Sequence, residues 1–509
     1  MRPRRLAAAA AAVALATVLA PFPASAHALG QAFTLPVPLT LYLLAAAAAV
    51  AASFAVAVVV VRPAGPVPGY RHRPVRDIAA RWGGPLLSVI GVLWWFGTIT
   101  LGFVVDPISP LAAVLFWIII WVGLPIITVI AGNPWPSISP FRTVFNLLER
   151  AGRLIGFDRI DLGLRYPAEL GRWPGVFLLF VTVWCELVLP DRTTPRTVAS
   201  LLTGYTLLTL GGMTLFGRVG WLRNVELFEI YLGWFGRVGP LGRRVVAPDA
   251  CSECAERCDP AHCVDCPECA AVAERGERRP ELRLWFTGLT EVRHAGWSDA
   301  GFIVLALAAV SFDGLSETAA WGAVMNPLFP ALTAIVGPFW TVLLLQTGGL
   351  LVIWGGFLAA FSAAAFLTRA MHDRDVEPEP MGATVGAYAA TLLPIAGGYL
   401  IAHYFTLLVQ GAIWLPALLA DPISGVAPPL DWMPISLVWY LSVGAIVAGH
   451  IAAVVLAHRM ALRDAPGRPI LAGLPLVILM VGYTVFSLWI IAQPITIEPG
   501  SGPAAFLLR

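Results

Sequence analysis

Long apolar segments separated by short polar segments run along almost the whole chain. A stretch of about 20 apolar residues fits an α-helix that crosses a bilayer, because each helical residue adds about 1.5 Å. The pattern therefore predicts an all-α, polytopic membrane helical bundle of about ten spans. The predicted spans are 36–61, 84–105, 109–131, 174–190, 197–216, 299–320, 337–368, 384–418, 435–461 and 469–492. The two longest contain glycine pairs and, in one case, Pro394, so tilt, a kink or a re-entrant piece is expected there.

Arginine residues alternate between the loops that join these spans. They are frequent after the first and third spans, throughout 217–298, and after the spans that end near 368 and 461. The loops in between, 106–110, 322–330 and 421–431, are poor in arginine. Cytoplasmic loops of membrane proteins carry the excess of basic residues. The arginine-rich loops are therefore predicted in the cytoplasm, with the mature N-terminus and the C-terminus on the outer side of the cell membrane.

Composition supports the same class of protein. The chain has 509 residues, of which 58% are hydrophobic and 13% charged, and its mean hydropathy is +0.77. A soluble domain carries about a quarter charged residues, so the lipid bilayer is the expected partner and nucleic acid is not. The sequence has no Walker loop, no G-x-G-x-x-G after a strand and no G-x-S-x-G elbow. Their absence weakens the hypotheses of ATP-driven transport and of a serine hydrolase.

The N-terminal 26 residues have the features of a secretory signal. A basic start is followed by an apolar run to Ala20 and by small residues that end at Ala26. The predicted organisation is a signal peptide (1–26), a first membrane bundle (36–216), a cytoplasmic loop (217–298), a second membrane bundle (299–492) and an extracytoplasmic tail (493–509). An uncleaved anchor is the alternative for the first segment.

Six of the seven cysteines lie in one part of the cytoplasmic loop. Their spacing is C-x2-C-x3-C-x4-C-x2-C-x2-C, and a C-x2-C pair presents two sulfurs at the bite of a tetrahedral metal. Because the cytoplasm is reducing, disulfides are not expected there. The predicted metal ligands are Cys251, Cys254, Cys258, Cys263, Cys266, Cys269 and His262.

Zinc is the predicted metal of this cysteine-rich loop. The thiolates at positions 251, 254, 263 and 266 form a two-knuckle zinc site, and the other three residues are alternative ligands. An iron–sulfur cluster is less expected, because Ala273 stands where a ferredoxin-type run has its fourth cysteine. A closed thiolate site is usually structural. The loop is therefore predicted to be stapled by zinc or to dock a cytosolic protein partner, with a redox or metal sensor as the alternative.

Two further cytoplasmic segments are predicted to be helical and partly amphipathic. Residues 139–156 alternate apolar side chains with arginine and glutamate, and residues 219–236 contain several aromatic residues. Both are expected to lie along the inner membrane surface as packing and anchoring elements.

Ionisable residues inside predicted spans are the candidates for function, since such groups are costly in a bilayer. His403 and His450 fall near the middle of consecutive antiparallel helices, so their imidazoles are expected to approach each other. His458 lies about 12 Å further along its helix and is expected at the membrane interface. The carboxylates Glu186, Asp313 and Glu317 are predicted in the outer half of the bundle, and the last two share a helix face.

Several chemistries suit this set of side chains. Two imidazoles and two or three carboxylates can ligate Zn, Mn or Fe, and such a second divalent metal would activate a bound water for hydrolysis. The same groups can relay protons or carry an ion, and a histidine pair can ligate haem. Packing by internal hydrogen bonds is the non-functional alternative. The candidate catalytic residues are His403, His450, Asp313, Glu317 and Glu186.

Four stretches of the chain resemble a known group of bacterial membrane proteins. They are H-A-L-G-Q-A-F-T-L-P-V-P-L-T-L-Y-L from His27, S-F-D-G-L-S-E-T from Ser311, A-H-Y-F-T-L-L-V-Q-G from Ala402 and V-G-A-I-V-A-G-H-I-A-A-V-V-L-A-H-R from Val443. With these stretches the chain is similar to the actinobacterial fenitrothion hydrolase-like family. The resemblance implies membrane-associated hydrolysis of a phosphotriester such as an organophosphate. The alternatives are a transporter or channel for a metal ion, proton or small solute, and a non-enzymatic factor that docks a cytosolic partner.

Overall fold

The computed structural model confirms the predicted fold class of an all-α, polytopic helical bundle. It describes residues 33–34, 38–61, 71–75, 78–245, 278–292, 295–371, 380–423, 427–493 and 496–497. Within these ranges, ten helical segments are long and apolar enough to cross a membrane. The predicted signal peptide and the cysteine-rich loop with His262 lie outside the described residues.

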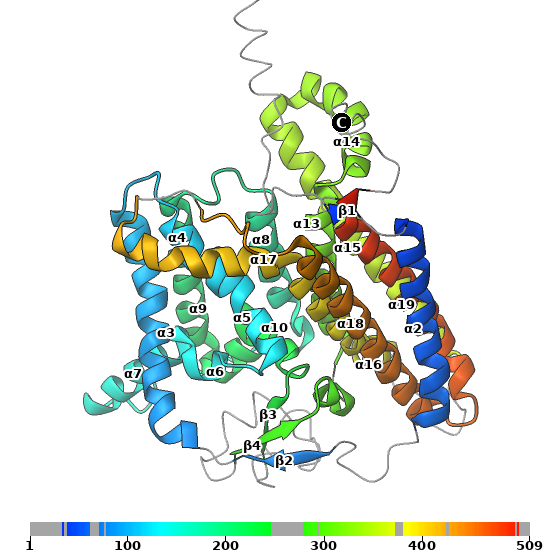
Figure 1. Cartoon of the computed structure of the whole chain (residues 1–509). Coiled ribbons are helices and arrows are strands. Elements are labelled where there is room, and N and C mark those ends of the chain that lie inside the picture. The colour runs from blue at the N-terminus through cyan, green and yellow to red at the C-terminus, as the bar shows by residue number, and fades with distance from the viewer. Residues whose placement is uncertain are drawn as a thin grey trace, which may run out of the picture.

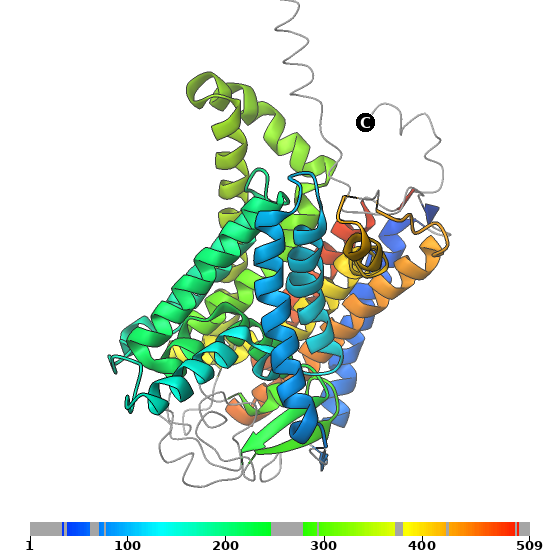
Figure 2. The same ribbon diagram turned by 90° about the vertical axis from the view of Figure 1, so that its left-hand side faces the viewer.

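The helices run back and forth between two ends of the bundle (Figure 1, Figure 2). We call the end that carries a three-stranded sheet the sheet end and the opposite end, near α14, the distal end. The longer helices are α2 (Leu39–Val60), α3 (Ile78–Val104), α8 (Trp173–Leu187), α9 (Pro195–Asn224), α13 (Trp297–Ser316), α14 (Ala319–Val336), α15 (Pro338–Arg369), α17 (Leu393–Ala420), α18 (Ile435–Asp464) and α19 (Pro469–Ala492). The shorter helices are α4 (Leu111–Ala113), α5 (Leu124–Ile130), α6 (Trp135–Ile138), α7 (Pro140–Leu154), α10 (Leu227–Gly236) and α16 (Met381–Ala389).

Each predicted span overlaps helical segments of the structure, with one shortfall and one omission. The span predicted at 174–190 corresponds to α8, which has only 15 residues. The omission is α14, an 18-residue helix without buried residues, which includes most of the predicted loop 322–330. The helix continues through Pro327 and Pro330, and the side chain of Thr318 accepts from Trp321 N and caps it. Figure 1 shows α14 beyond the distal ends of its neighbours.

Two of the crossings are interrupted. Residues Val114–Gly123 form a π-helix, η1, between α4 and α5. The 3-10 turn η6 (Ala390–Leu392) separates α16 from α17, with Pro394 at the start of α17, so the predicted irregularity at this proline is confirmed. Figure 2 shows α17 almost end-on, so its axis runs steeply across the bundle instead of along it. Interrupted helices in membranes are frequent at functional sites.

The helix α10 corrects the prediction that residues 219–236 lie along the membrane surface. Every residue of α10 except Gly233 is buried. Its sequence, L-F-E-I-Y-L-G-W-F-G, is apolar on all sides, and a helix of that kind belongs in the interior. At its N-terminus the Glu226 carboxylate accepts from Phe228 N and Glu229 N.

A small antiparallel sheet closes the sheet end. Its strands are β2 (His72–Pro74), β3 (Leu241–Val245) and β4 (Arg278–Arg283), in the order β2-β4-β3. Two loops predicted as cytoplasmic thus meet in one sheet. At the distal end, β1 (Phe33–Thr34) pairs in parallel with β5 (Thr496–Ile497), which brings both ends of the described chain to the same end of the bundle. Which side of a membrane that end faces stays a prediction.

The sheet holds the C-terminus of α10 through a buried arginine. The Arg283 guanidinium is 0% exposed and donates to Gly236 O (3.1 Å), Gly239 O (3.3 Å) and Glu281 Oε1 (3.3 Å). Arg244 donates to the other oxygen of Glu281 at 3.2 Å. Because a positive charge is favourable at a helix C-terminus, Arg283 complements the cap that Glu226 provides at the other end.

We expect Arg283→Met to lower the free energy of unfolding by about 3–5 kcal/mol, because it leaves the Glu281 charge buried with one partner and two carbonyls without donors. Denaturation of the purified protein by titration with SDS measures the effect. Arg279→Met is the matched control, since Arg279 lies on the same strand and is exposed. Equal losses in the two variants would contradict the role given to Arg283.

Candidate functional site

Asp313 of α13 is the centre of the polar groups inside the bundle. Its Oδ2 atom accepts from His403 Nε2 at 2.9 Å and from Tyr404 OH at 2.7 Å. The side chain of His403 is 2% exposed and that of Asp313 17% exposed. Two donors from neighbouring positions of α17 thus meet one carboxylate oxygen of α13.

Gly314 allows α13 and α17 to approach closely at this point. A Cβ atom there would lie 2.6 Å from Ile490 Cγ2, 3.0 Å from Tyr399 OH and 3.5 Å from His403 Cε1. The ring of Tyr399 stacks on that of His403, with centroids 6.0 Å apart. The glycine after Asp313 therefore leaves room for the aromatic groups that line the carboxylate.

Two further carboxylates interact with Asp313. Glu186 at the end of α8 interacts electrostatically with Asp313 and with Arg192, and the Trp121 indole of η1 faces its carboxylate. Glu317 follows α13 and interacts electrostatically with Asp313 and His403. The structure therefore brings together four of the five predicted catalytic residues. We call Glu186, Asp313, Glu317, His403 and Tyr404 the acid–imidazole cluster.

Tyrosines complete this cluster, and the sequence analysis missed them. Tyr231 of α10 stacks on Trp121 with centroids 5.5 Å apart and interacts electrostatically with Glu186. Tyr399 and His403 are four residues apart, and Tyr404 is adjacent to His403. The run Y-L-I-A-H-Y could therefore have predicted that tyrosines lie beside the histidine. A helix spacing of four places Tyr399 on the same face as the histidine.

His450, the fifth predicted residue, is not joined to the cluster. Its ring is 0% exposed, and Nδ1 donates to Ile446 O of its own helix at 2.8 Å. The Nε2 atom has no hydrogen-bond partner among the residues that the structure describes. The predicted approach of the two imidazoles is therefore not a direct contact.

His458 is packed inside the bundle near the C-terminal end of α18, and its place at the membrane interface stays a prediction. It is 1% exposed, and its ring lies edge-on to Phe54 of α2, with centroids 5.6 Å apart. Neither ring nitrogen has a hydrogen-bond partner within the described ranges. The helix α18 thus contains two buried histidines, and His458 is the one nearer its C-terminus.

No three His, Cys, Asp or Glu side chains of the described part of the chain are arranged to hold a metal ion. The ligands predicted for zinc, at 251–269, lie outside that part. Zinc or an iron–sulfur cluster in the loop, and a second divalent metal in the bundle, therefore stay predictions.

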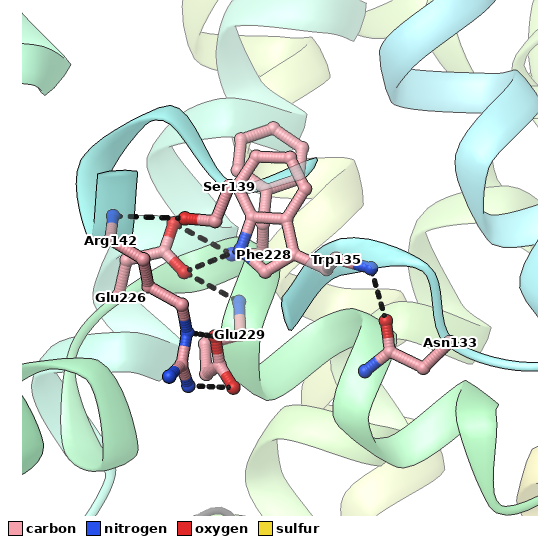
Figure 3. A network of polar contacts seen from close by, with 7 residues as sticks. All are labelled: Asn133, Trp135, Ser139, Arg142, Glu226, Phe228 and Glu229. Atoms are coloured by element: carbon pink, nitrogen blue, oxygen red, sulfur yellow. Dashed lines mark hydrogen bonds and ion pairs between the residues drawn. The ribbon is translucent and has the colours of Figure 1, made fainter. Parts of the chain in front are cut away.

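A second buried carboxylate network lies at the N-terminus of α10 (Figure 3). Glu226 accepts from Tyr205 OH (2.6 Å), Trp135 Nε1 (3.2 Å), Phe228 N (3.2 Å) and Glu229 N (2.6 Å). The sequence analysis did not single out this residue. Both of its oxygens are occupied by donors from the surrounding helices, so Glu226 fixes structure and offers no open position to a ligand.

Arg142 of α7 completes this network. It donates to both oxygens of Glu229, from Nε at 3.1 Å and from Nη2 at 2.6 Å. Burial alone would lower the pKa of the guanidinium, but the Glu229 carboxylate outweighs burial and raises it above its ordinary value. The amphipathic helix α7 is thereby tied to α10.

We expect Gly314→Ala to lower the free energy of unfolding by about 1–3 kcal/mol, because the added methyl overpacks the contact with Ile490 and Tyr399. Gly322→Ala in α14 is the control, since no atom lies within 4 Å of its added Cβ. Thermal unfolding in detergent compares the two variants. A Gly314→Ala protein as stable as the control would show that this approach is not tight.

Comparison with known proteins finds no match: no family model, no curated protein and no solved structure matches this chain. The function of the site is therefore argued from its geometry and from its place in the bundle.

Proposed function

We propose that the acid–imidazole cluster binds and releases protons, and that the protein couples this proton exchange to transport across the membrane. The observation that supports the proposal most strongly is that His403 and Tyr404 both hydrogen-bond to one oxygen of Asp313. The substrate class is the proton, together with an ion or small solute whose movement the proton drives.

Charge balance supports proton binding. Glu186, Glu317 and His403 each interact with Asp313 inside the bundle, and Arg192 acts on Glu186 and Asp313. Uncompensated charges are expensive in an apolar interior. The groups therefore share protons, and a change in the protonation of one changes the field at the others.

The surrounding helices also favour transport. The cluster is lined by η1, which is a π-helix, by α17, which starts at a 3-10 turn, and by the short buried helix α10. Transporters commonly place their ion sites where helices are interrupted near the middle of the membrane. Interrupted helices have alternative packings close in energy, which a two-state transport cycle needs.

Hydrolysis is the second candidate, and the Asp313–His403 pair is the observation that favours it. A carboxylate that holds one ring nitrogen of a histidine orients the imidazole as a general base for water. The resemblance to fenitrothion hydrolase-like proteins implies a phosphotriester substrate. Under this proposal His403 removes a proton from water, and Asp313 stabilises the resulting imidazolium.

We expect Asp313→Asn to lower proton flux at least about tenfold, because the amide cannot ionise. Purified protein in liposomes that contain a pH-sensitive dye, exposed to a pH step, measures the rate. Asp106→Asn is the isosteric control, since Asp106 lies in an exposed turn outside the cluster.

Unchanged flux in Asp313→Asn would overturn the transport proposal. A wild-type protein that moves no protons but hydrolyses a phosphotriester, with that activity lost in His403→Gln, would establish the second candidate instead.

Elemental analysis of the purified protein tests the metal predictions. We expect about one zinc per chain, absent after the cysteines at 251, 254, 263 and 266 are replaced by serine. Metal that persists in that variant and disappears with Asp313→Asn would reveal a second metal in the bundle. A metal-free wild-type protein would contradict both predictions.

A further inference from the structure

The helix α18 holds two buried imidazoles that the cluster does not use. His450 is 0% exposed and His458 1% exposed. Between them, His450 Nε2 and both ring nitrogens of His458 have no hydrogen-bond partner among the described residues. A buried polar atom without a partner costs folding free energy, so packing alone would favour apolar side chains at both positions.

The packing of α17 on α18 fixes the order of these groups along the bundle. Ser442 Oγ donates to Ala402 O at 3.0 Å, and a Cβ on Gly398 would lie 2.4 Å from Ala445 O. His403 is therefore level with the part of α18 just before Ala445. From Ser442, which is level with Ala402, His450 lies about 12 Å closer to the sheet end, and His458 about a further 12 Å, at the rise of an α-helix.

The packed segments of α17 and α18 run antiparallel, since Gly398 meets Ala445 and Gly449 meets Pro394, so side chains on the two segments incline in opposite axial directions. Helical side chains point toward the N-terminus of their own helix. The bond from His450 Nδ1 to Ile446 O confirms this lean for His450.

Beyond the two histidines, α18 ends at a carboxylate at the sheet end. Asp464, the last residue of α18, lies about 9 Å beyond His458 at helical rise. Its carboxylate accepts from Tyr388 OH at 3.1 Å and, on both oxygens, from Arg463, with Nε at 2.5 Å and Nη2 at 2.9 Å. Unlike that of Glu226, the side chain of Asp464 is partly exposed, at 16%, so it can exchange protons with water at this end of the helix.

Little else on the neighbouring helices can titrate. The segments 39–60, 338–368, 393–420 and 469–492 contain no Asp, Glu, Lys or Arg. The titratable side chains that remain there include Tyr399, Tyr404 and Tyr483, besides His403. Tyr388 joins them from α16. The two histidines of α18 thus lie between the cluster and Asp464 along this helix.

We propose that His450 and His458 form the second half of a proton path that joins the acid–imidazole cluster to Asp464. The inference rests on the proposed function of the cluster. Bridging water carries the proton between stations. His450 takes up a proton at Nε2 and gives it up from the same atom, because Ile446 O holds Nδ1–H. Each imidazole is left unchanged after the proton has passed.

Phenylalanine variants test the path. His450→Phe and His458→Phe keep an aromatic ring but remove the nitrogens, and each is expected to lower proton flux in liposomes at least tenfold. Tyr440→Phe is the control, since Tyr440 is a 54% exposed residue of the same helix. Thermal unfolding should show both histidine variants at least as stable as the wild type, because the unpartnered nitrogens are gone.

The outcomes separate the two proposals. Full flux in both histidine variants, together with its loss in Asp313→Asn, would overturn the path and keep the function of the cluster. Full flux in Asp313→Asn, or none in the wild type, would overturn both. A Soret band that the histidine variants lose would identify haem ligands instead of proton stations.

Discussion

A buried backbone needs partners for its terminal N–H and C=O groups, and α10 meets that need with two charged side chains. Glu226 occupies two N–H groups at one end, and Arg283 occupies carbonyls at the other. The signs of both charges match the helix dipole. Without these caps, a ten-residue helix could not remain in an apolar interior, where an unsatisfied backbone group is costly. The caps in turn tie the sheet, α7 and α9 to one buried element.

The position of α10 also links the sheet end to the acid–imidazole cluster, because α10 carries Tyr231 against Trp121 and Glu186. Two kinds of buried carboxylate therefore lie within one bundle. Glu226 accepts hydrogen bonds from four donors and serves only to hold the surrounding helices in place. Asp313 shares one oxygen between two donors and lies in the field of two more carboxylates. In the second arrangement the carboxylate charge is balanced by His403 and Arg192 instead of by a closed set of hydrogen bonds.

The positions of the spans and of most cluster residues followed from sequence, since span length and the cost of buried charge are local properties. Asp313, Glu317 and Glu186 were chosen on that ground, and the structure brings Asp313 and Glu317 to His403 and Glu186 to Asp313. The failures came from properties that depend on neighbours. The middle of α14 was predicted as a loop, although a threonine cap and the following residues sustain a helix. The aromatic run of α10 suggested a surface, because nothing local showed that Glu226 and Arg283 would hold it inside.

The charge-free helices around α18 restrict what can move along it. A metal cation needs several oxygen or nitrogen ligands at once, whereas the segments packed on α18 offer isolated imidazoles and phenols. A proton needs only one acceptor at a time, and its charge is spread over the imidazole that binds it. The spacing of His403, His450 and His458 along two antiparallel helices thus suits a proton better than any larger ion.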